Sequence, residues 1–520
     1  MDAYEIMAST SNNKIILKNT GMLYIRMLVV MAVSFYTVRI VLEELGISDY
    51  GLYNIVGGIV VLFSFLKTTL TSASQRFFSF TIGKGNVKEM EEIFKTNIFF
   101  YLIVCAVIII LSETIGLWFL NSQLNIELDR IEAANWTYQM SIIAFILSTM
   151  TVPYESVITS HENMSFYAYV SILEAFLKLI VAYLLALFQY DKLIIYSILI
   201  TFSSLVVFLV YAIYCQKKFQ ECSFGFSWNR KMFKEIAAYS AWNIVGTTAS
   251  IVNNQGSNIV LNLYFGTVVN GAKAIASQII GVATRFSSNF FTAVRPRLIK
   301  LYASGRLDEM YKLINQSAKV SYFLIFIIAL PLILQIDYVL SLWLGHVPPY
   351  AKIFAILSIV SILIDSLSNP LVSAAQATGN IKKYQITLCI ILLSGVPVSY
   401  CLLSFYKNPN LVFYITIFIS LISLIARLII VRSLIKLPVK SFLKDVVFHV
   451  CLSSTLSVIV AYIYIHYSHS SGNSFLGFVV NTLIILIVTV AAIIVFGLNK
   501  TERTQVKTIL NKLINKLILR

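Results

Sequence analysis

Apolar segments long enough to cross a membrane recur along the whole chain and are separated by short polar links. A transmembrane helix needs ~20 mostly apolar residues, and the pattern predicts about fourteen such helices. Because the segments beginning near 193, 236 and 268 are polar or abut their neighbours, twelve or thirteen spans are the alternatives. The predicted spans cover residues 17–42, 54–81, 95–120, 135–160, 166–188, 193–216, 236–264, 268–294, 313–335, 351–376, 383–405, 410–431, 443–466 and 475–498.

The composition agrees with an all-α integral membrane fold. Hydrophobic residues make up 58% of the 520 positions and charged residues 12%, whereas soluble domains carry about 25% charged residues. The net charge of +16 comes mostly from lysines and arginines at both termini and in the links that follow even-numbered spans. By the positive-inside rule, this asymmetry predicts that both termini are cytoplasmic. Basic residues that face anionic headgroups also explain the charge without a nucleic-acid partner.

Two pairs of similar stretches indicate an internal repeat. The sequence "GISDYGLYNIVGGI" from Gly46 matches "GTVVNGAKAIASQI" from Gly266 without a gap. A second pair, "PYESVITSHENMSFY" from Pro153 and "PLVSAAQATGNIKKY" from Pro370, matches at nearly the same separation. Transporters are often built from duplicated halves, so we expect spans 1–6 and 7–12 to be two copies of one unit. The matching positions include Gly46/Gly266, Gly51/Gly271, Gly85/Gly305, Pro153/Pro370, Ser156/Ser373, Asn163/Asn380 and Tyr167/Tyr384.

The repeat predicts two pseudo-symmetric six-helix lobes plus two extra helices. In the tail, apolar residues from Val506 to Ile518 recur at helical spacing with lysines between them, which predicts an amphipathic helix on the inner membrane surface. The predicted domains are the N-terminal lobe 1–216, a cytoplasmic linker 217–234, the C-terminal lobe 235–436, spans 13 and 14 within 437–498, and the tail 499–520.

Five cations fall inside the spans that begin each half. Ionisable residues at such positions are costly and usually functional. Span 1 carries Arg26 and Arg39, span 2 carries Lys67 and Arg76, and span 8 carries Arg285. Arg39 and Arg76 lie near span ends, where snorkelling to the interface is the alternative. Arg26, Lys67 and Arg285 lie deeper and are predicted to contact the substrate.

Span 7 carries no charge but is rich in amides and hydroxyls. Asn243, Thr247, Ser250, Asn254 and Asn258 recur at steps of three and four residues, which places them on one helical face. Hydrogen bonding between helices is the alternative role. With the cations of spans 1, 2 and 8, this face predicts a wet, electropositive cavity between the two halves. Arginine and lysine suit phosphate, and amides and hydroxyls suit sugars.

The acidic residues lie in other spans. Glu155 in span 4 and Asp365 in span 10 are candidates for coupling transport to a proton or a sodium ion. Glu174 and Lys178 stand in the preferred order for a helical ion pair and are interpreted as structural. The five histidines and six cysteines show no spacing typical of a zinc site or a disulfide framework. We therefore expect no metal and no cofactor.

The chain resembles the polysaccharide-transporter family of lipid-linked oligosaccharide flippases, the Wzx-like O-antigen exporters. That family shares a superfamily with the multidrug and toxic compound extrusion transporters. The resemblance rests on "LGISDYGLYNIVGGI" at Leu45–Ile59, "SASQRFFSFTIGKGN" at the end of span 2, "SHENMSFYAYVSILEAFLKL" at Ser160–Leu179 and "AAQATGNIKKYQI" at Ala374–Ile386. It implies two lobes that alternate between inward- and outward-facing states in the bacterial inner membrane.

The resemblance also implies the cargo and the partners. The cargo would be an undecaprenyl-pyrophosphate-linked oligosaccharide, the repeat unit of an O-antigen, capsule or exopolysaccharide, whose pyrophosphate meets the cations of the cavity. The partners would be membrane lipids, a polymerase and other polysaccharide-assembly proteins.

Three other functions are alternatives. A multidrug exporter of the same superfamily needs acidic residues for cationic drugs, whereas the leading spans carry Arg26, Lys67 and Arg285. A membrane enzyme such as an oligosaccharide polymerase usually has a large outer loop with catalytic residues, but the outward links here are short. An amino-acid or nucleobase carrier is the third alternative. The sequence contains no P-loop, which argues against an ATP-driven pump.

Overall fold

The computed structural model describes residues 2–61, 64–122, 126, 128–188, 190–223, 229–344, 347–467, 475–499 and 502–504. Within these ranges every regular element is a helix, so the predicted all-α fold is confirmed. The apolar face of the predicted tail helix, from Val506 to Ile518, lies outside the described residues.

Within the described ranges, 11 helices are long and apolar enough to cross a membrane. The predicted spans that are absent from this set, 54–81, 236–264 and 268–294, are helical where the structure describes them but are more polar. The predicted count of about fourteen spans is therefore compatible with the structure. The 11 candidates are Asn19–Gly46, Lys88–Ser122, Leu128–Ser160, Met164–Leu187, Lys192–Lys218, Leu307–Leu334, Ala351–Thr378, Lys382–Phe405, Asn410–Ile435, Val439–Tyr467 and Phe475–Gly497.

The chain forms two compact units. Unit 1 comprises Met1–Thr247 and Thr292–Gly305, and unit 2 comprises Thr248–Phe291 and Arg306–Arg520. The long helix α9 (Arg230–Ala303) therefore has both ends in unit 1 and its middle in unit 2. The lobe boundaries expected from the sequence stay a prediction. They follow the internal repeat, whereas the two units are defined by how compactly the chain packs.

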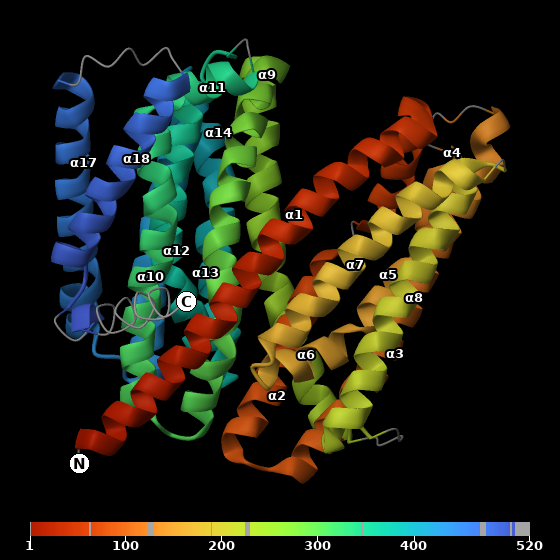
Figure 1. Cartoon of the computed structure of the whole chain (residues 1–520), viewed down its shortest axis with the longest axis horizontal. Coiled ribbons are helices and arrows are strands. Elements are labelled where there is room, and N and C mark those ends of the chain that lie inside the picture. Colours follow the sequence, from red (N-terminus) through yellow and green to blue (C-terminus); the bar gives the residue numbers. More distant parts are fainter. Residues whose placement is uncertain are drawn as a thin grey trace, which may run out of the picture. The chain divides into compact units, whose positions relative to one another are not determined.

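The helices of unit 1 before α9 are drawn in red to yellow-green in Figure 1. They are α1 (Asp2–Val61), α2 (Ser64–Lys84), α3 (Val87–Leu111), α4 (Leu117–Ser122), α5 (Ile131–Met150), α6 (Val152–Ser160), α7 (Met164–Leu184) and α8 (Lys192–Lys218), with the short π-helix η1 (Ser112–Gly116) and the short 3-10 helices η2 (Leu128–Arg130), η3 (Leu185–Leu187) and η4 (Gln220–Cys222).

The helices of unit 2 after α9 are drawn in green to blue in Figure 1. They are α10 (Leu307–Leu334), α11 (Ile336–Leu344), α12 (Ala351–Thr378), α13 (Lys382–Leu393), α14 (Gly395–Phe405), α15 (Asn410–Ile435), α16 (Val439–Phe442), α17 (His449–Tyr467) and α18 (Phe475–Ala492), with η5 (Leu443–Phe448) and η6 (Ile493–Gly497).

Helix α9 reverses direction within unit 2. The ammonium of Lys273 donates a hydrogen bond to the carbonyl oxygen of Asn254 at 3.3 Å. In a straight helix, residues 19 positions apart would be separated by about 28 Å along the axis, far beyond the reach of a lysine. Val260 and Ala276 also share one hydrophobic core. Predicted spans 7 and 8 are therefore the two arms of α9.

The backbone confirms the repeat seen in the sequence. Gly85 in the first half aligns with Gly305 in the second half, and both residues have a φ of 72°. The next aligned pair with an unusual conformation is Glu162, with φ of 61°, and Gly379, with φ of 77°. Left-handed residues are rare outside glycine, so their recurrence at the predicted separations shows that the two halves share one chain path.

The two extra helices pack on the second half. α17 and α18 contact one another and α10, and Ile325 and Ala329 share a buried core with Ala461 and Ile485. The start of the tail is also fixed to α10: Lys319, only 1% exposed, forms an ion pair with Glu502. This bond holds residues 502–504 against unit 2.

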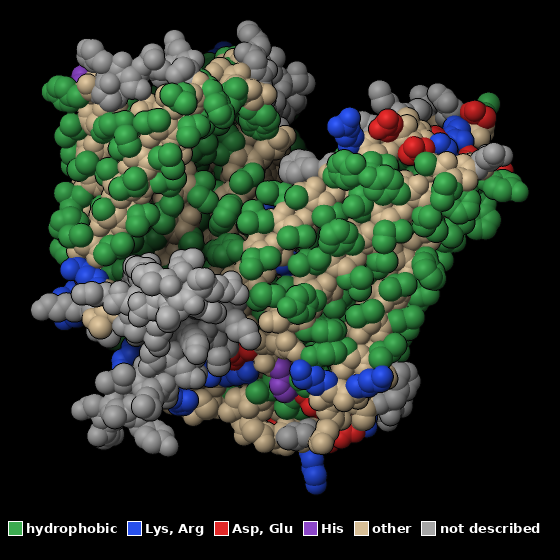
Figure 2. Space-filling view, viewed as in Figure 1, with side chains coloured by type: hydrophobic (Ala, Val, Ile, Leu, Met, Phe, Trp, Pro, Cys, Tyr) green, Lys and Arg blue, Asp and Glu red, His purple; other side chains and the backbone are tan. Residues whose placement is uncertain are grey.

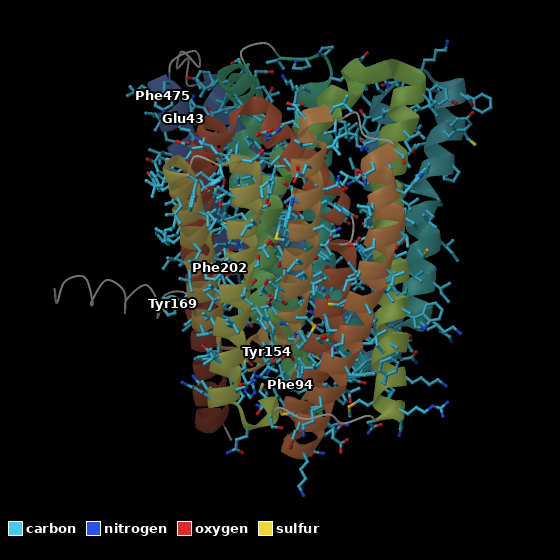
Figure 3. All side chains as sticks on the ribbon, turned by 90° about the vertical axis from the view of Figure 1, so that its right-hand side faces the viewer. Glu43, Phe94, Tyr154, Tyr169, Phe202 and Phe475 are labelled. Carbon is cyan, nitrogen blue, oxygen red and sulfur yellow. The ribbon has the colours of Figure 1, made fainter. Side chains whose placement is uncertain are left out.

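The surface of unit 1 has the distribution expected of a membrane protein. Hydrophobic side chains cover the middle of α7 and α8, and charged side chains gather at the helix ends (Figure 2). Large apolar residues such as Phe202 are well exposed, at 60%. Aromatic side chains also pack inside the unit, where Phe94 and Tyr154 meet edge to face with ring centroids 5.4 Å apart (Figure 3). The exposed apolar belt is explained by contact with lipid.

The left-handed glycines give the first testable prediction. At Gly85 and Gly305 a new Cβ would meet no atom within 4 Å, so replacing either by alanine adds only backbone strain, about 1–2 kcal/mol. Both Gly85→Ala and Gly305→Ala should lower the thermal unfolding midpoint of the solubilised protein by similar amounts. Gly281→Ala is the matched control, because Gly281 has open space and lies in helical α9. An equal midpoint for Gly281→Ala and Gly305→Ala would contradict the prediction.

Candidate functional site

Unit 1 places Arg26 against the start of α7. The guanidinium of Arg26 lies 4.8 Å from the centroid of the Tyr167 ring and donates a hydrogen bond of 3.4 Å to the Ser171 hydroxyl. The position of Tyr167 on α7 is fixed by Asn163, whose side chain caps that helix. Arg26 is thus held inside the unit by an aromatic face and a hydroxyl, rather than extended towards the interface.

Lys67 and Glu155 lie close to the same arginine. Lys67 on α2 donates a hydrogen bond to the Ser148 hydroxyl on α5. Glu155 on α6 lies close to Tyr167 and is within electrostatic range of Lys67, Arg26 and Glu174. The structure therefore brings together two predicted substrate contacts and one predicted ion-coupling acid. We call Arg26, Lys67, Glu155 and Tyr167 the unit 1 cluster; it holds two cations and one carboxylate.

Arg76 occupies a different setting. Only 8% exposed, its guanidinium lies over the rings of Phe77, Phe80 and Tyr239, with centroids 4.7, 4.8 and 5.5 Å away. Tyr239 belongs to the first arm of α9, so Arg76 joins α2 to α9 through stacked aromatic groups. Snorkelling, the alternative raised by its position in the sequence, does not describe this arginine.

Arg295 adds a cation that sequence reasoning did not single out. It lies at the end of the second arm of α9 and donates hydrogen bonds to the Ser72 hydroxyl at 3.0 Å and the Ser72 carbonyl at 3.4 Å. Its position just before Pro296, near a predicted span end, made it look like an ordinary interfacial residue. Contact with a serine of α2 instead places it among the polar residues of that helix.

The polar stripe of span 7 is divided between the two units. Asn243, 4% exposed, is buried in unit 1. Its carbonyl accepts a hydrogen bond of 3.0 Å from the Thr247 hydroxyl, and Thr69 of α2 bonds Thr247 at 3.3 Å. This part of the stripe therefore contributes a hydrogen bond between α2 and α9, which is the alternative role that the sequence suggested for it.

The other part of the stripe lies in unit 2. Asn254 is exposed, and the amide of the half-buried Asn258 donates a hydrogen bond of 2.9 Å to Gln255 on its own helix. Arg285 on the second arm of α9 is also exposed, and its side chain has no hydrogen bond or ion pair with the described residues. Asn254 and Arg285 are therefore accessible to a ligand. The prediction that spans 1, 2, 7 and 8 line one cavity stays a prediction.

A second charged group lies in unit 2. Asp365, at the middle of α12, is exposed and lies within electrostatic range of Arg427 and close to Ser420. Both Ser420 and Arg427 belong to α15, which packs on α12. Arg427 also lies within electrostatic range of Tyr384, a fully buried residue of α13. Sequence reasoning missed Arg427, although this arginine lies inside the predicted span 410–431.

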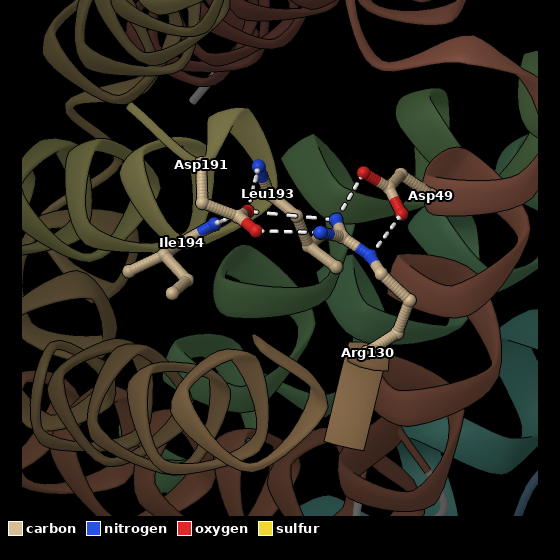
Figure 4. Close-up of polar contacts among 5 residues, drawn as sticks. All are labelled: Asp49, Arg130, Asp191, Leu193 and Ile194. Carbon is tan, nitrogen blue, oxygen red and sulfur yellow. Dashed lines mark hydrogen bonds and ion pairs between the residues drawn. The ribbon is translucent and has the colours of Figure 1, made fainter. Parts of the chain in front are cut away.

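Surface ion pairs hold both ends of unit 1. At one end Arg130 bonds both carboxylate oxygens of Asp49 and lies 2.6 Å from Asp191, which itself caps α8 through the amides of Leu193 and Ile194 (Figure 4). Arg130, at the end of η2, thus connects α1 with the start of α8, two elements that are far apart in the sequence.

The other end of unit 1 is held by the link between α6 and α7. The side chain of Glu162 pairs with Lys300 at 2.8 Å, and its carbonyl accepts a bond of 3.0 Å from Asn19. His161 lies 2.6 Å from Glu221. Burial raises the pKa of Glu221, but the hydrogen bond with His161, a backbone hydrogen bond and the charge of His161 together outweigh burial and leave that pKa below its usual value. These contacts are structural.

The remaining predicted residues are a helical ion pair and an arginine of α1. Glu174 and Lys178 form the predicted helical ion pair, at 2.6 Å. Arg39 is exposed on α1. No group of three or more His, Cys, Asp or Glu side chains is gathered as metal ligands in the described part of the chain.

The contrast between Arg76 and Arg39 gives the second prediction. Cation–π contacts of a desolvated arginine contribute about 2 kcal/mol, so Arg76→Gln should lower the thermal unfolding midpoint. Arg39→Gln, at an exposed position of α1, should leave the midpoint unchanged. The measurement is thermal unfolding in detergent, and equal midpoints for the two variants would contradict the structural role of Arg76.

Solved structures with the same fold are membrane transporters. An outward-facing multidrug resistance MATE family transporter of the MOP superfamily aligns with a TM-score of 0.67 at 15% identity, covering 81% of this chain and 96% of that one. The Vibrio cholerae MATE transporter VcmN in its bent form gives 0.67 at 14%, covering 83% and 98%. A MOP superfamily transporter from Pyrococcus furiosus, described as having a binding pocket of reversed polarity, gives 0.62 at 13%, covering 81% and 96%. At these identities the likeness establishes the fold.

The sequence comparison establishes the family. No curated protein matches the chain, but the family model for polysaccharide biosynthesis proteins matches residues 16–302, more than half of its length. The predicted class, a multi-pass membrane transporter rather than an enzyme, agrees with this family and with the fold. The chain therefore belongs to the polysaccharide biosynthesis protein family and has the fold of MOP superfamily transporters.

Proposed function

We propose that this protein is a flippase that moves an undecaprenyl-pyrophosphate-linked oligosaccharide from the cytoplasmic to the outer leaflet by alternating access. The observation that carries the proposal is the charge of the polar groups within the membrane helices. The unit 1 cluster holds Arg26 and Lys67 against one carboxylate, Glu155. In unit 2, Arg285 is exposed without a side-chain partner among the described residues.

An excess of cations in a low-dielectric site favours an anionic ligand. A pyrophosphate group offers several oxygen acceptors, and arginine binds such oxygens through a planar fork while lysine acts as a point charge. The exposed Asn254 and the half-buried Asn258 of α9 provide amide partners for sugar hydroxyls. Membership of a polysaccharide biosynthesis family supports a glycan as the remainder of the cargo.

A multidrug exporter is the second candidate, and the fold is the observation that favours it. One of the aligned structures is a multidrug resistance MATE family transporter, and another is a MATE transporter. The Pyrococcus furiosus transporter, described as having a pocket of reversed polarity, indicates that one fold accommodates pockets of different charge. Charge is therefore a better guide to cargo than fold, and cationic drugs fit poorly beside Arg26 and Lys67.

The proposal includes the energy source, the location and the partners. Glu155 and Asp365 are the candidate sites for a coupling proton or sodium ion, because each is a carboxylate within a membrane helix. The location is the bacterial cytoplasmic membrane, with both termini on the cytoplasmic side. A polymerase and other polysaccharide-assembly proteins would receive the flipped cargo.

The test is made in cells that depend on this protein for surface polysaccharide. Lys67→Ala and Arg285→Ala should each lower surface polysaccharide at least tenfold and leave lipid-linked precursor on the cytoplasmic face. The expected cause is the loss of a charge that binds pyrophosphate. Export is measured by labelling intact cells, and the precursor by extraction and digestion of inside-out vesicles.

Lys95→Ala is the matched control, because Lys95 is a lysine of unit 1 whose partner, Glu91, is on its own helix. All variants should reach the membrane at wild-type levels, as judged by immunoblotting. Normal export by the Lys67→Ala/Arg285→Ala double variant would falsify the proposal that these cations bind cargo. Reduced accumulation of cationic dyes on expression would favour the multidrug exporter instead.

A further inference from the structure

The first arm of α9 exposes two different kinds of side chain in unit 2. Asn254 and Gln255 are exposed and Asn258 is half-buried, and the Asn258 amide donates a hydrogen bond of 2.9 Å to the side-chain oxygen of Gln255. Residues three and four positions apart are neighbours on a helix surface, so these three amides form one surface, which we call the amide patch. Ile251, one turn earlier, is apolar and exposed, so the patch begins at Asn254.

An apolar stripe runs beside the amide patch. Val252, Ile259 and Leu263 are 45%, 60% and 67% exposed, and their spacing of seven and four residues places them along one side of the helix. We call these three residues the apolar stripe. Gln255 is three positions from Val252 and four from Ile259, so it contacts the stripe as well as the other amides. The boundary between the two surfaces therefore lies at Gln255.

Close packing against α14 fixes which side of this arm is exposed. A Cβ added at Gly256 would come within 2.5 Å of the Val396 side chain, and one added at Gly395 would come within 2.6 Å of the Asn253 side chain. The two helices therefore approach so closely that neither glycine position has room for a side chain. The arm cannot turn about its axis without breaking this packing, so the amide patch and the apolar stripe keep their directions.

The two surfaces require different solvents. An exposed amide in hydrocarbon would leave its donors and acceptors without partners, so the amide patch faces water. Exposed apolar side chains are stabilised by contact with lipid instead. The purely lipid-facing helix α18 differs, because its amide, Asn481, is buried and accepts a hydrogen bond of 3.1 Å from Tyr464. On the exposed side of α9, water and hydrocarbon therefore border the same helix.

We infer that this boundary binds a lipid-linked sugar, with sugar hydroxyls on the amide patch and the polyprenyl chain along the apolar stripe. The inference rests on the proposed function and adds a site for the lipid chain of the cargo. Amides both donate and accept hydrogen bonds, as sugar hydroxyls do, and a polyprenyl chain is an uncharged hydrocarbon. Each half of such a molecule keeps the solvent that it already has, so neither the sugars enter hydrocarbon nor the chain enters water.

The experiment detects the lipid chain by photocrosslinking. The full-length protein carries the photoreactive residue benzoylphenylalanine in place of Ile259 or, as the control, in place of the similarly exposed Ile487 of α18. Each protein is reconstituted in phosphatidylglycerol nanodiscs with radiolabelled lipid-linked oligosaccharide extracted from the producing cells. Position 259 should give several times more labelled adduct than position 487, and an excess of unlabelled lipid-linked oligosaccharide should abolish that adduct.

The second part of the experiment removes the amides. Asn254→Ala/Gln255→Ala should raise the concentration of lipid-linked oligosaccharide that gives half-maximal adduct at position 259 about tenfold, which corresponds to ~1.4 kcal/mol. The same double variant should leave the half-maximal concentration of labelled undecaprenyl pyrophosphate unchanged, because that lipid carries no sugar. Gln216→Ala is the matched control, since Gln216 is an exposed amide near the end of α8, outside the amide patch.

Two outcomes overturn the inference: equal adduct from positions 259 and 487, and an unchanged half-maximal concentration in the double variant. If the double variant fails to fold, as judged by its thermal midpoint, Gln255→Leu takes its place and should also raise the half-maximal concentration. Flipping in proteoliposomes is measured separately. Adduct from position 259 without flipping would reject the flippase and leave the lipid-linked sugar site standing, whereas flipping with equal adducts would reject the site alone.

Discussion

The cost of placing an ionised side chain inside a membrane helix governs how the polar residues of this chain are arranged. Each such charge needs a partner or water, because hydrocarbon provides neither. In the described structure, three of these cations have specific partners. Arg26 has an aromatic face and a serine, Lys67 has a serine, and Arg76 has three rings. The helices that carry these groups are fixed by the same contacts that compensate the charges.

These partners also separate structural cations from candidate binding cations. Arg76 is enclosed by rings on α2 and α9, and Lys319 is enclosed by its ion pair with Glu502. Neither has capacity for a ligand. Arg285, in contrast, is exposed. Charge within a span is therefore a weak indicator of function until the surroundings of each charge are known.

The internal repeat connects the fold with the site. Gly85 and Gly305 turn the chain in the same way in the two halves, so the halves share a backbone. Their polar groups differ, since a serine in unit 1, Ser148, takes the place of Asp365 in unit 2. One backbone thus supports two sets of charges, and the cargo that we propose, an oligosaccharide-linked pyrophosphate, is itself asymmetric.

The sequence by itself determined the all-α membrane fold, the approximate spans and the duplication, because hydropathy and repeated glycines are local signals. It also indicated which spans carry unusual charge, including Arg26 and Lys67. Only the tertiary structure decided what each charge contacts. Arg427 of α15 lies within electrostatic range of Tyr384 of α13, and the Arg295–Ser72 contact joins α9 to α2. Such pairs depend on which helix faces pack together, and periodicity within one helix carries no information about its neighbour.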